Sequence, residues 1–170
     1  MVQNKSQKVT VKIAEKNERL KTRVMELLHE WPDQFVHGLF EETAEKDFNE
    51  SDIAIATIGD EIVGCLMFNR KTTNEFNWLA VSKKIERGSK ASIAKQLFEK
   101  FFSTIEPGTT VCLFPNTEDA FISGVESFSG KSFEPARRLY RSMGFELKEE
   151  NIMSDHYGPG AHVYKVERVL

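Results

Sequence analysis

Apolar residues recur along the chain in two ways, either in short runs and alternation or at the spacing of a helix. Alternation and short apolar runs bounded by turn residues predict strands, and recurrence every three to four residues predicts amphipathic helices. The predicted strands are 8–14, 52–58, 61–69, 76–81, 109–114, 145–148 and 162–169. The predicted helices are 18–30, a shorter one from Val36 towards Phe48, 93–105 and 133–143.

Glycine and proline mark several boundaries between these elements. Gly59-Asp60 separates two strand patterns by two residues, which is typical of a β-hairpin. Gly64 lies inside a strand pattern, where it indicates a bulge. Pro32 ends the first predicted helix, and Gly144 has the place of a left-handed residue that follows a helix. The elements therefore follow the order β α α β β β α β α β β.

This order predicts an α+β fold built on one mixed sheet. The early hairpins favour antiparallel pairing, and the strand–helix–strand unit through 93–105 favours one parallel pair joined by a right-handed crossover. We predict a three-layer α/β/α architecture in which helices cover both faces of a mostly antiparallel sheet of about seven strands. The length of 170 residues, without repeats or a linker, predicts one domain over 1–170.

Composition narrows the function classes. The formal net charge is −3 without a long basic run, which argues against nucleic acid as the main partner. No apolar stretch is long enough to span a bilayer, so we expect a cytoplasmic protein without membrane attachment. Cys65 and Cys112 lie in apolar strand patterns; their count leaves a disulfide open, but we favour two buried thiols. The four histidines lack metal-ligand spacing, so no metal is expected.

The most informative stretch joins the strand 76–81 to the helix 93–105. Residues 82–92 are mostly small, polar or basic, with three lysines and one arginine. Free backbone N–H groups at a helix N-terminus, together with the helix dipole, favour an anion. We therefore hypothesise that a phosphate-bearing cofactor binds there, although solvated surface charge explains the basic residues equally well.

Two patterns in the second half of the chain resemble the GCN5-related N-acetyltransferases, the acetyl-CoA-dependent GNAT family. Residues 136–145 read A-R-R-L-Y-R-S-M-G-F, which is similar to the family's A-x-x-L-Y-x-x-x-G-F. Residues 75–81 read E-F-N-W-L-A-V, which is similar to the family's E-[IL]-x-x-L-x-V strand. The resemblance covers about 52–170 well and the N-terminal helices by position only.

The cofactor loop departs from the family pattern [QR]-x-x-G-x-[GA]. Alignment on Leu97 places small residues at its three positions, namely Ser89, Ser92 and Ala94. Alignment on Arg87 places Lys90 and Ser92 at the glycine positions but misaligns the helix, so we prefer the first. Serine and alanine adopt a positive φ less readily than glycine, which predicts weakened cofactor affinity. The resemblance implies that a diphosphate is bound by the backbone N–H groups of Ser89, Lys90, Ala91, Ser92, Ile93 and Ala94.

The resemblance also implies how the rest of the cofactor is held. Backbone groups of the strand at Leu79, Ala80 and Val81 would hold the pantetheine arm and polarise the acetyl carbonyl, as oxyanion-hole donors do. In this family the strands 76–81 and 109–114 splay apart to admit the arm. Asn116 would hydrogen-bond the arm, although an asparagine in a Pro-Asn-Thr turn is the more ordinary interpretation.

Two residues are candidates for proton transfer. Tyr140 would protonate the departing thiolate; its spacing alone favours a packed aromatic, and the motif around it reverses that judgement. Glu75 would deprotonate the amine directly or through water, and an exposed strand-end glutamate is an equal alternative. Tyr157, in the turn-rich loop 155–160, is a weaker acceptor-side candidate, and 121–129 is either a lid over the acceptor pocket or an unstructured excursion.

The function that this resemblance implies is transfer of acetyl from acetyl-CoA to a primary amine of a small molecule or peptide. The amine would attack directly in a ternary complex, because two buried cysteines are poor nucleophiles. Two alternatives stay open: a CoA-binding or regulatory module without catalysis, and an acetyltransferase that modifies proteins. Homodimers are common in the family, so a homodimer is also open.

Overall fold

The computed structural model describes residues 8–31, 40–71, 73–114, 134–154 and 163–170. Its helices are α1 (Glu18–His29), α2 (Phe40–Glu50), α3 (Arg87–Phe102), α4 (Glu134–Ser142) and a short 3₁₀ turn (Glu149–Asn151). Its strands are β1 (Val9–Ile13), β2 (Asp52–Ile58), β3 (Glu61–Asn69), β4 (Glu75–Val81), β5 (Thr110–Leu113), β6 (Ile152–Met153), β7 (Val163–Tyr164) and β8 (Val166–Val169).

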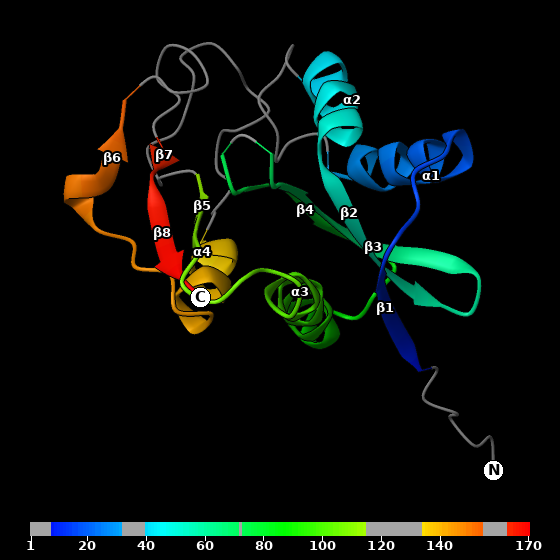
Figure 1. The fold of residues 1–170 in the computed structure, drawn as a ribbon. Helices are drawn as coiled ribbons and strands as arrows, with labels where there is room; N and C mark the ends of the chain where they lie inside the picture. The colour runs from blue at the N-terminus through cyan, green and yellow to red at the C-terminus, as the bar shows by residue number, and fades with distance from the viewer. Residues whose placement is uncertain (1–7, 32–39, 72, 115–133, 155–162) are drawn as a thin grey trace, which may run out of the picture.

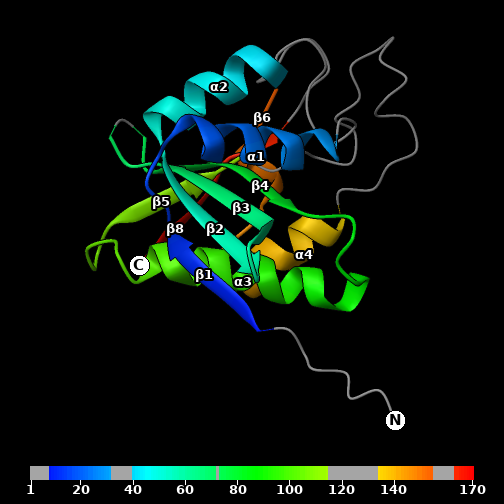
Figure 2. The ribbon, with the colours of Figure 1, turned by 90° about the vertical axis from the view of Figure 1, so that its right-hand side faces the viewer.

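One sheet of six strands organises the described residues. Its strand order is β1-β2-β3-β4-β5-β8, and every neighbouring pair is antiparallel except the parallel pair β4–β5. A separate pair is formed by β6 and β7. Figure 1 and Figure 2 show α1 and α2 on one face of the six-stranded sheet and α3 and α4 on the other. The predicted three-layer, mostly antiparallel α+β fold is confirmed, with six strands in the main sheet where about seven were expected.

Phenylalanine side chains fill the layer between the sheet and α3. The rings of Phe68 and Phe76 stack with centroids 4.5 Å apart, and Phe98 meets Phe76 edge-on at 4.8 Å. Phe98 and Phe101 of α3 are fully buried, since their side chains repeat at helical spacing on the sheet-facing side. This layer fixes α3 beneath β4, the strand that precedes it.

The predicted hairpin and bulge are both present in β2 and β3. Gly59 has a φ of +59°, which a two-residue hairpin turn requires. Next to Gly64, β3 contains one residue more than β2. A Cβ on Gly64 would lie only 3.1 Å from Ile93 Cγ2 and 3.3 Å from Leu97 Cδ1. Glycine therefore allows α3 to approach the sheet closely at this point.

Three element boundaries differ from the sequence-based prediction. Helix α3 begins at Arg87 rather than 93, because its first turn is polar and exposed and so lacks apolar periodicity. Residues 145–148 form no strand, since β8 already occupies the edge beside β5. The predicted strand 162–169 divides at Lys165, because β7 pairs with β6 and β8 pairs with β5.

Candidate functional site

The strands β4 and β5 are paired only where β4 begins. Their parallel register joins Glu75 to Cys112, and the Cys112 N–H donates to the Asn74 carbonyl at 3.0 Å. Beyond this pair, the described residues of the two strands form no other, and Figure 1 shows the strands diverging from each other. The splayed strands expected from the sequence are therefore present.

The second half of β4 consequently has an open edge. In an antiparallel pair, successive residues direct their peptide groups alternately towards the partner strand and away from it. The Ser82 N–H donates to Val63 of β3 at 2.8 Å, so Ser82 and Ala80 face β3. Leu79 and Val81 therefore direct their N–H and C=O groups towards the edge that β5 leaves.

This arrangement separates three residues that the sequence grouped together. Leu79 and Val81 have backbone groups at the open edge, as predicted. Ala80 does not, because its peptide groups belong to the ladder with β3 and its side chain is buried in the layer beneath α1 and α2. The register therefore favours Leu79 and Val81 over Ala80 as residues that could meet a ligand through their backbone.

A bulge in β4 lies immediately before the open edge. Asn77 and Trp78 of β4 face the single residue Met67 of β3, so the strand bends at this point. The Oδ1 atom of Asn77 is buried and has no hydrogen-bond partner in the described part of the chain. A buried, unpaired amide oxygen is costly unless a ligand or water donates to it. Sequence analysis passed over Asn77, although a polar residue within an apolar strand pattern was a usable signal.

A second set of free backbone groups lies at the start of α3. Glu86 precedes the helix without a side-chain cap, and the Ser89 N–H is used in a bond of 2.9 Å to the Glu86 carbonyl. Within the described part of the chain, the N–H groups of Glu86, Arg87 and Gly88 have no partner. A Cβ added to Gly88 would meet nothing within 4 Å, so packing does not require glycine there.

The early start of α3 places most of the predicted phosphate-binding residues inside the helix. From Ala91 to Ala94, each N–H donates within the helix to the carbonyl four residues earlier and is not available to a ligand. Ile93 and Ala94 are also buried. Ser89 and Lys90 remain in the first turn, and the free donors lie just before them, at 86–88. The dipeptide Arg87-Gly88 in the sequence could have indicated this position.

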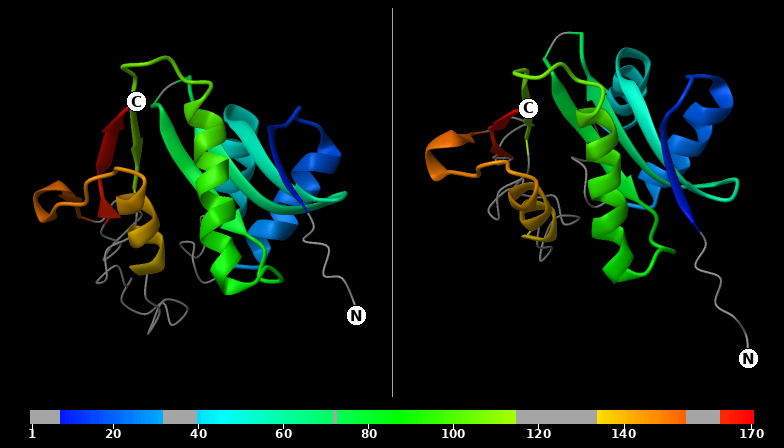
Figure 3. Two further views of the ribbon diagram at one scale, coloured as in Figure 1. Left: turned by 90° about the horizontal axis from the view of Figure 1, so that it is seen from below. Right: turned by 60° about the horizontal axis from the view of Figure 1, so that its bottom comes forward.

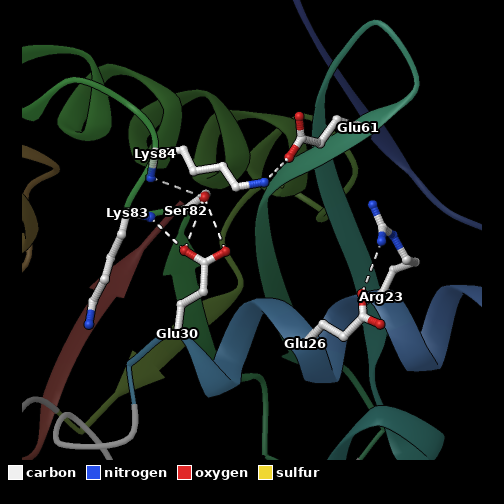
Figure 4. A network of polar contacts seen from close by, with 7 residues as sticks. All are labelled: Arg23, Glu26, Glu30, Glu61, Ser82, Lys83 and Lys84. Carbon is white, nitrogen blue, oxygen red and sulfur yellow. Dashed lines mark hydrogen bonds and ion pairs between the residues drawn. The ribbon is translucent and has the colours of Figure 1, made fainter.

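Two residues directly after α1 also reach this region, and no sequence pattern indicated either. The Trp31 indole N–H donates to the Val81 carbonyl at 2.9 Å. The Glu30 carboxylate accepts from the Ser82 hydroxyl and from the Lys83 N–H, as Figure 4 shows. The contacts span about fifty residues of sequence, which local pattern analysis does not cover.

Glu75 lies at the closed start of β4 in a negatively charged environment. Burial, followed by the neighbouring Asp47 carboxylate, raises its pKa above the usual value, and a hydrogen bond with the Thr73 side chain opposes the shift. Asp47 is held by the Trp78 indole N–H at 2.7 Å. A raised pKa brings a carboxyl closer to the range in which general bases work.

Tyr140 lies where α4 meets α3. Its ring is edge-on to Phe98 of α3 at 6.1 Å and to Phe145 at 6.5 Å, and Figure 3 shows the two helices side by side. Burial raises the pKa of the phenol to about 12, so the hydroxyl is protonated at neutral pH. The ring is therefore part of the packed layer, as its spacing alone suggested, and the raised pKa makes its hydroxyl a weaker proton donor than an exposed phenol.

The two cysteines are free and buried, as predicted. Burial raises the pKa of Cys65 to about 12 and that of Cys112 to about 11, which disfavours the nucleophilic thiolate. Asn116, Tyr157 and the segment 121–129 lie outside the described residues.

The described residues contain no group of three or more His, Cys, Asp or Glu side chains that could hold a metal ion. None of the helices described is long and apolar enough to cross a bilayer.

Comparison with known proteins finds similarity in structure only. No protein-family profile matches the sequence, and no curated protein matches it. An aminoglycoside 6′-acetyltransferase type Ii is similar, with a TM-score of 0.65, 19% identity, and 94% of this chain and 96% of that chain covered. An aminoglycoside 6′-N-acetyltransferase complexed with coenzyme A has a TM-score of 0.63 and 17% identity over 94% and 96% of the two chains.

A GNAT family acetyltransferase from Elizabethkingia anophelis with acetyl-CoA bound has a TM-score of 0.63 and 13% identity, over 95% of this chain and 98% of that chain. Likeness at this level of identity concerns the fold, and in each case it extends over nearly the whole of both chains. The sheet with its splayed parallel pair and its two helical layers thus has a known counterpart: the chain has the fold of the GCN5-related N-acetyltransferases.

Proposed function

We propose that this protein transfers acetyl from acetyl-CoA to a primary amine of a small molecule or peptide. The observation that carries the proposal is the open edge of β4, where Leu79 and Val81 present backbone groups that β5 does not pair. Similar structures that contain CoA or acetyl-CoA support the choice of cosubstrate.

In this proposal the cosubstrate lies between β4 and the start of α3. The Leu79 and Val81 N–H groups hold the pantetheine arm and the acetyl carbonyl, and polarise the thioester as charge develops on its oxygen. The N–H groups of 86–88 bind the diphosphate, because donors at a helix start are oriented towards an anion. The basic side chains nearby, Lys83, Lys84, Arg87 and Lys90, add favourable charge.

The acceptor amine must lose a proton before it can attack. An amine with a pKa of ~10.4 is neutral in about one molecule in a few thousand at pH 7, a penalty of roughly 4–5 kcal/mol. Glu75 is the proposed base. It lies four residues before Leu79, about 13 Å along a strand that rises ~3.3 Å per residue, so it acts through water rather than directly.

The proposed reaction forms one covalent bond to the acetyl carbon and breaks one. The amine nitrogen attacks the thioester carbon, the new C–N bond forms, and the C–S bond breaks. The proton that the nitrogen loses as the C–N bond forms passes through water to Glu75, and the thiolate takes a proton from the Tyr140 hydroxyl. The tyrosinate then recovers a proton from water and Glu75 releases its proton to water, so that both residues return to their starting states. The raised pKa of Cys65 and Cys112 supports direct attack over an acyl-enzyme.

Calorimetric titration with CoA, followed by an assay of thiol release, tests the proposal. We expect CoA at a hundred times its Kd to raise the free energy of unfolding by about 2.7 kcal/mol. Acetyl-CoA should then release free thiol in the presence of an acceptor, tested with an aminoglycoside, a polyamine and a lysine peptide. No binding of CoA at millimolar concentration would contradict the proposal.

A CoA-binding module without catalysis is the second candidate. It is favoured by one observation, the position of Ser92 and Ala94 within the second turn of α3 where the family pattern has glycines near the diphosphate. This candidate predicts CoA binding with no thiol release above the uncatalysed rate for any acceptor.

A further inference from the structure

The two residues that directly follow α1 hold the turn between β4 and α3 by several contacts at once. The Lys83 N–H donates to Glu30 Oε2 at 2.6 Å, and the Ser82 hydroxyl donates to the same carboxylate at 3.0 Å. Ser82 is only 2% exposed, although its side chain is polar. Beside this contact, the Trp31 indole is bonded to Val81 at the open edge. We name Glu30 and Trp31 the α1 latch.

We propose that the α1 latch positions the CoA-binding groups of β4 and α3, an inference that rests on the proposed function. Glu30 and Trp31 are positioning residues in this proposal, because they act on the turn and strand that would contact CoA. They fix where the free N–H groups of 86–88 and the open edge at Val81 lie relative to each other.

The hydrogen bonds of the turn support this role. Three successive N–H groups are occupied: that of Lys83 by Glu30, that of Lys84 by the Ser82 hydroxyl at 3.3 Å, and that of Ile85 by the Ser82 carbonyl at 3.1 Å. The next three, at 86–88, have no partner among the residues that the structure describes. Glu30 orients Ser82, and Ser82 in turn accepts from the Lys84 and Ile85 N–H groups. The latch therefore determines which donors face a ligand.

Trp31 also gathers two positive charges beside these donors. The Lys83 Nζ lies 4.9 Å from the centre of the indole ring and the Lys90 Nζ lies 5.1 Å from it. Lys83 belongs to the turn and Lys90 to the first turn of α3. Attraction to an aromatic face reduces the freedom of both long side chains, so less entropy is lost when they meet a phosphate.

The test measures the Kd for CoA by calorimetry and the kcat and KM for acetyl-CoA in the wild type and in four variants. We expect Glu30→Ala and Trp31→Leu each to raise the Kd and KM for CoA species about tenfold, with kcat at saturation within twofold of the wild type. Glu30→Gln keeps an oxygen for the Lys83 N–H and should recover most of the affinity. Trp31→Phe keeps the ring but loses the N–H, and should lie between Trp31→Leu and the wild type.

Glu26→Ala is the matched control, because it lies one turn earlier on the same helix. Its carboxylate pairs with Arg23 at 3.0 Å in an exposed position, away from the turn, as Figure 4 shows. We expect this variant to bind CoA as the wild type does.

The outcomes separate this inference from the proposed function. If the wild type binds CoA and the Glu30→Ala and Trp31→Leu variants bind it equally well, the latch does not position the site and only this inference fails. The same holds if these variants lose thermal stability and kcat in parallel while the Kd is unchanged, since that is the signature of a purely structural contact. If the wild type does not bind CoA, both proposals are overturned.

Discussion

The two ends of β4 lie in different surroundings although they are only a few residues apart. At its start, Glu75 and Phe76 are flanked by β3 on one side and β5 on the other, with Phe76 in the aromatic layer above α3. At its end, Leu79 and Val81 have a strand neighbour on one side only within the described ranges. One strand thus supplies both a rigid attachment and an unpaired hydrogen-bonding edge, with a bulge between them.

The difference shows how one end of a strand can be fixed by packing while the backbone groups at its other end stay available to a ligand. The packed start of β4 fixes the bulge at Asn77 and therefore the direction of the open end. Since β5 diverges from this end, the Leu79 and Val81 N–H groups are left for a ligand, while the Val81 carbonyl accepts from Trp31. The following predictions test this contrast, from the largest expected effect to the smallest.

Phe76→Ala should disrupt the closed end. The ring packs against Phe68, Phe98 and Phe101, and removal of a buried phenylalanine costs about 3–5 kcal/mol. Denaturant unfolding should show this loss. Leu79→Ala, at the half-buried open end, serves as the control and should cost clearly less. Equal losses at the two positions would mean that the ends do not differ in packing.

Tyr140→Phe should affect catalysis without affecting the fold. The ring contacts with Phe98 and Phe145 remain, so the free energy of unfolding should change little. Loss of the proton donor should lower kcat on the order of 10²-fold. Steady-state kinetics and thermal denaturation on the same preparation check both parts, and an unchanged kcat would remove Tyr140 from the mechanism.

Proline substitutions at the adjacent positions 79 and 80 should distinguish the β4 edge that pairs with β3 from the open edge. Ala80→Pro removes an N–H from the ladder with β3, and an unsatisfied buried partner costs about 1–3 kcal/mol. Leu79→Pro removes an N–H that the fold does not use, so it should destabilise less and weaken CoA binding more. Unfolding and CoA titration of both variants give the comparison. The reverse ranking would assign Leu79 to the β3 ladder.

Glu75→Gln should change the pH dependence of both rate and stability. The base must be ionised to act, so wild-type kcat should fall as the pH drops through the raised pKa of Glu75, and this limb should be absent in the variant. For stability the sign is opposite. Because the folded state holds the proton more tightly than the unfolded state, wild-type stability falls relative to the variant as the pH rises from the usual glutamate pKa through the raised one. Parallel profiles in the two proteins would argue against an ionisation of Glu75.

Much of the fold was predictable because its pattern is local. The strands 52–58 and 61–69 are apolar runs on either side of Gly59-Asp60, and the structure has the same two strands. The start of α3 was not predictable from periodicity, because its first turn contains no apolar residue that repeats at helical spacing. The division of the last strand at Lys165 depends on which strands lie beside it, which a single segment does not record.

The candidate site was predictable where a motif marked it and not where distant segments meet. Leu79 and Val81 were found through the strand motif, and their orientation follows from the register with β3. The α1 latch joins the end of one helix to a turn about fifty residues later, and no local pattern indicates such a contact. The bulge at Asn77 likewise depends on the register of a neighbouring strand.

Residue-resolved amide hydrogen exchange with and without CoA tests the central claim most directly. If the open edge of β4 binds the cosubstrate arm, the Leu79 and Val81 amides should exchange quickly in the free protein and slow markedly when CoA is added. The Ala80 amide, bonded to β3, should be slow in both states. Exchange at Leu79 and Val81 that CoA leaves unchanged at saturation would contradict the account.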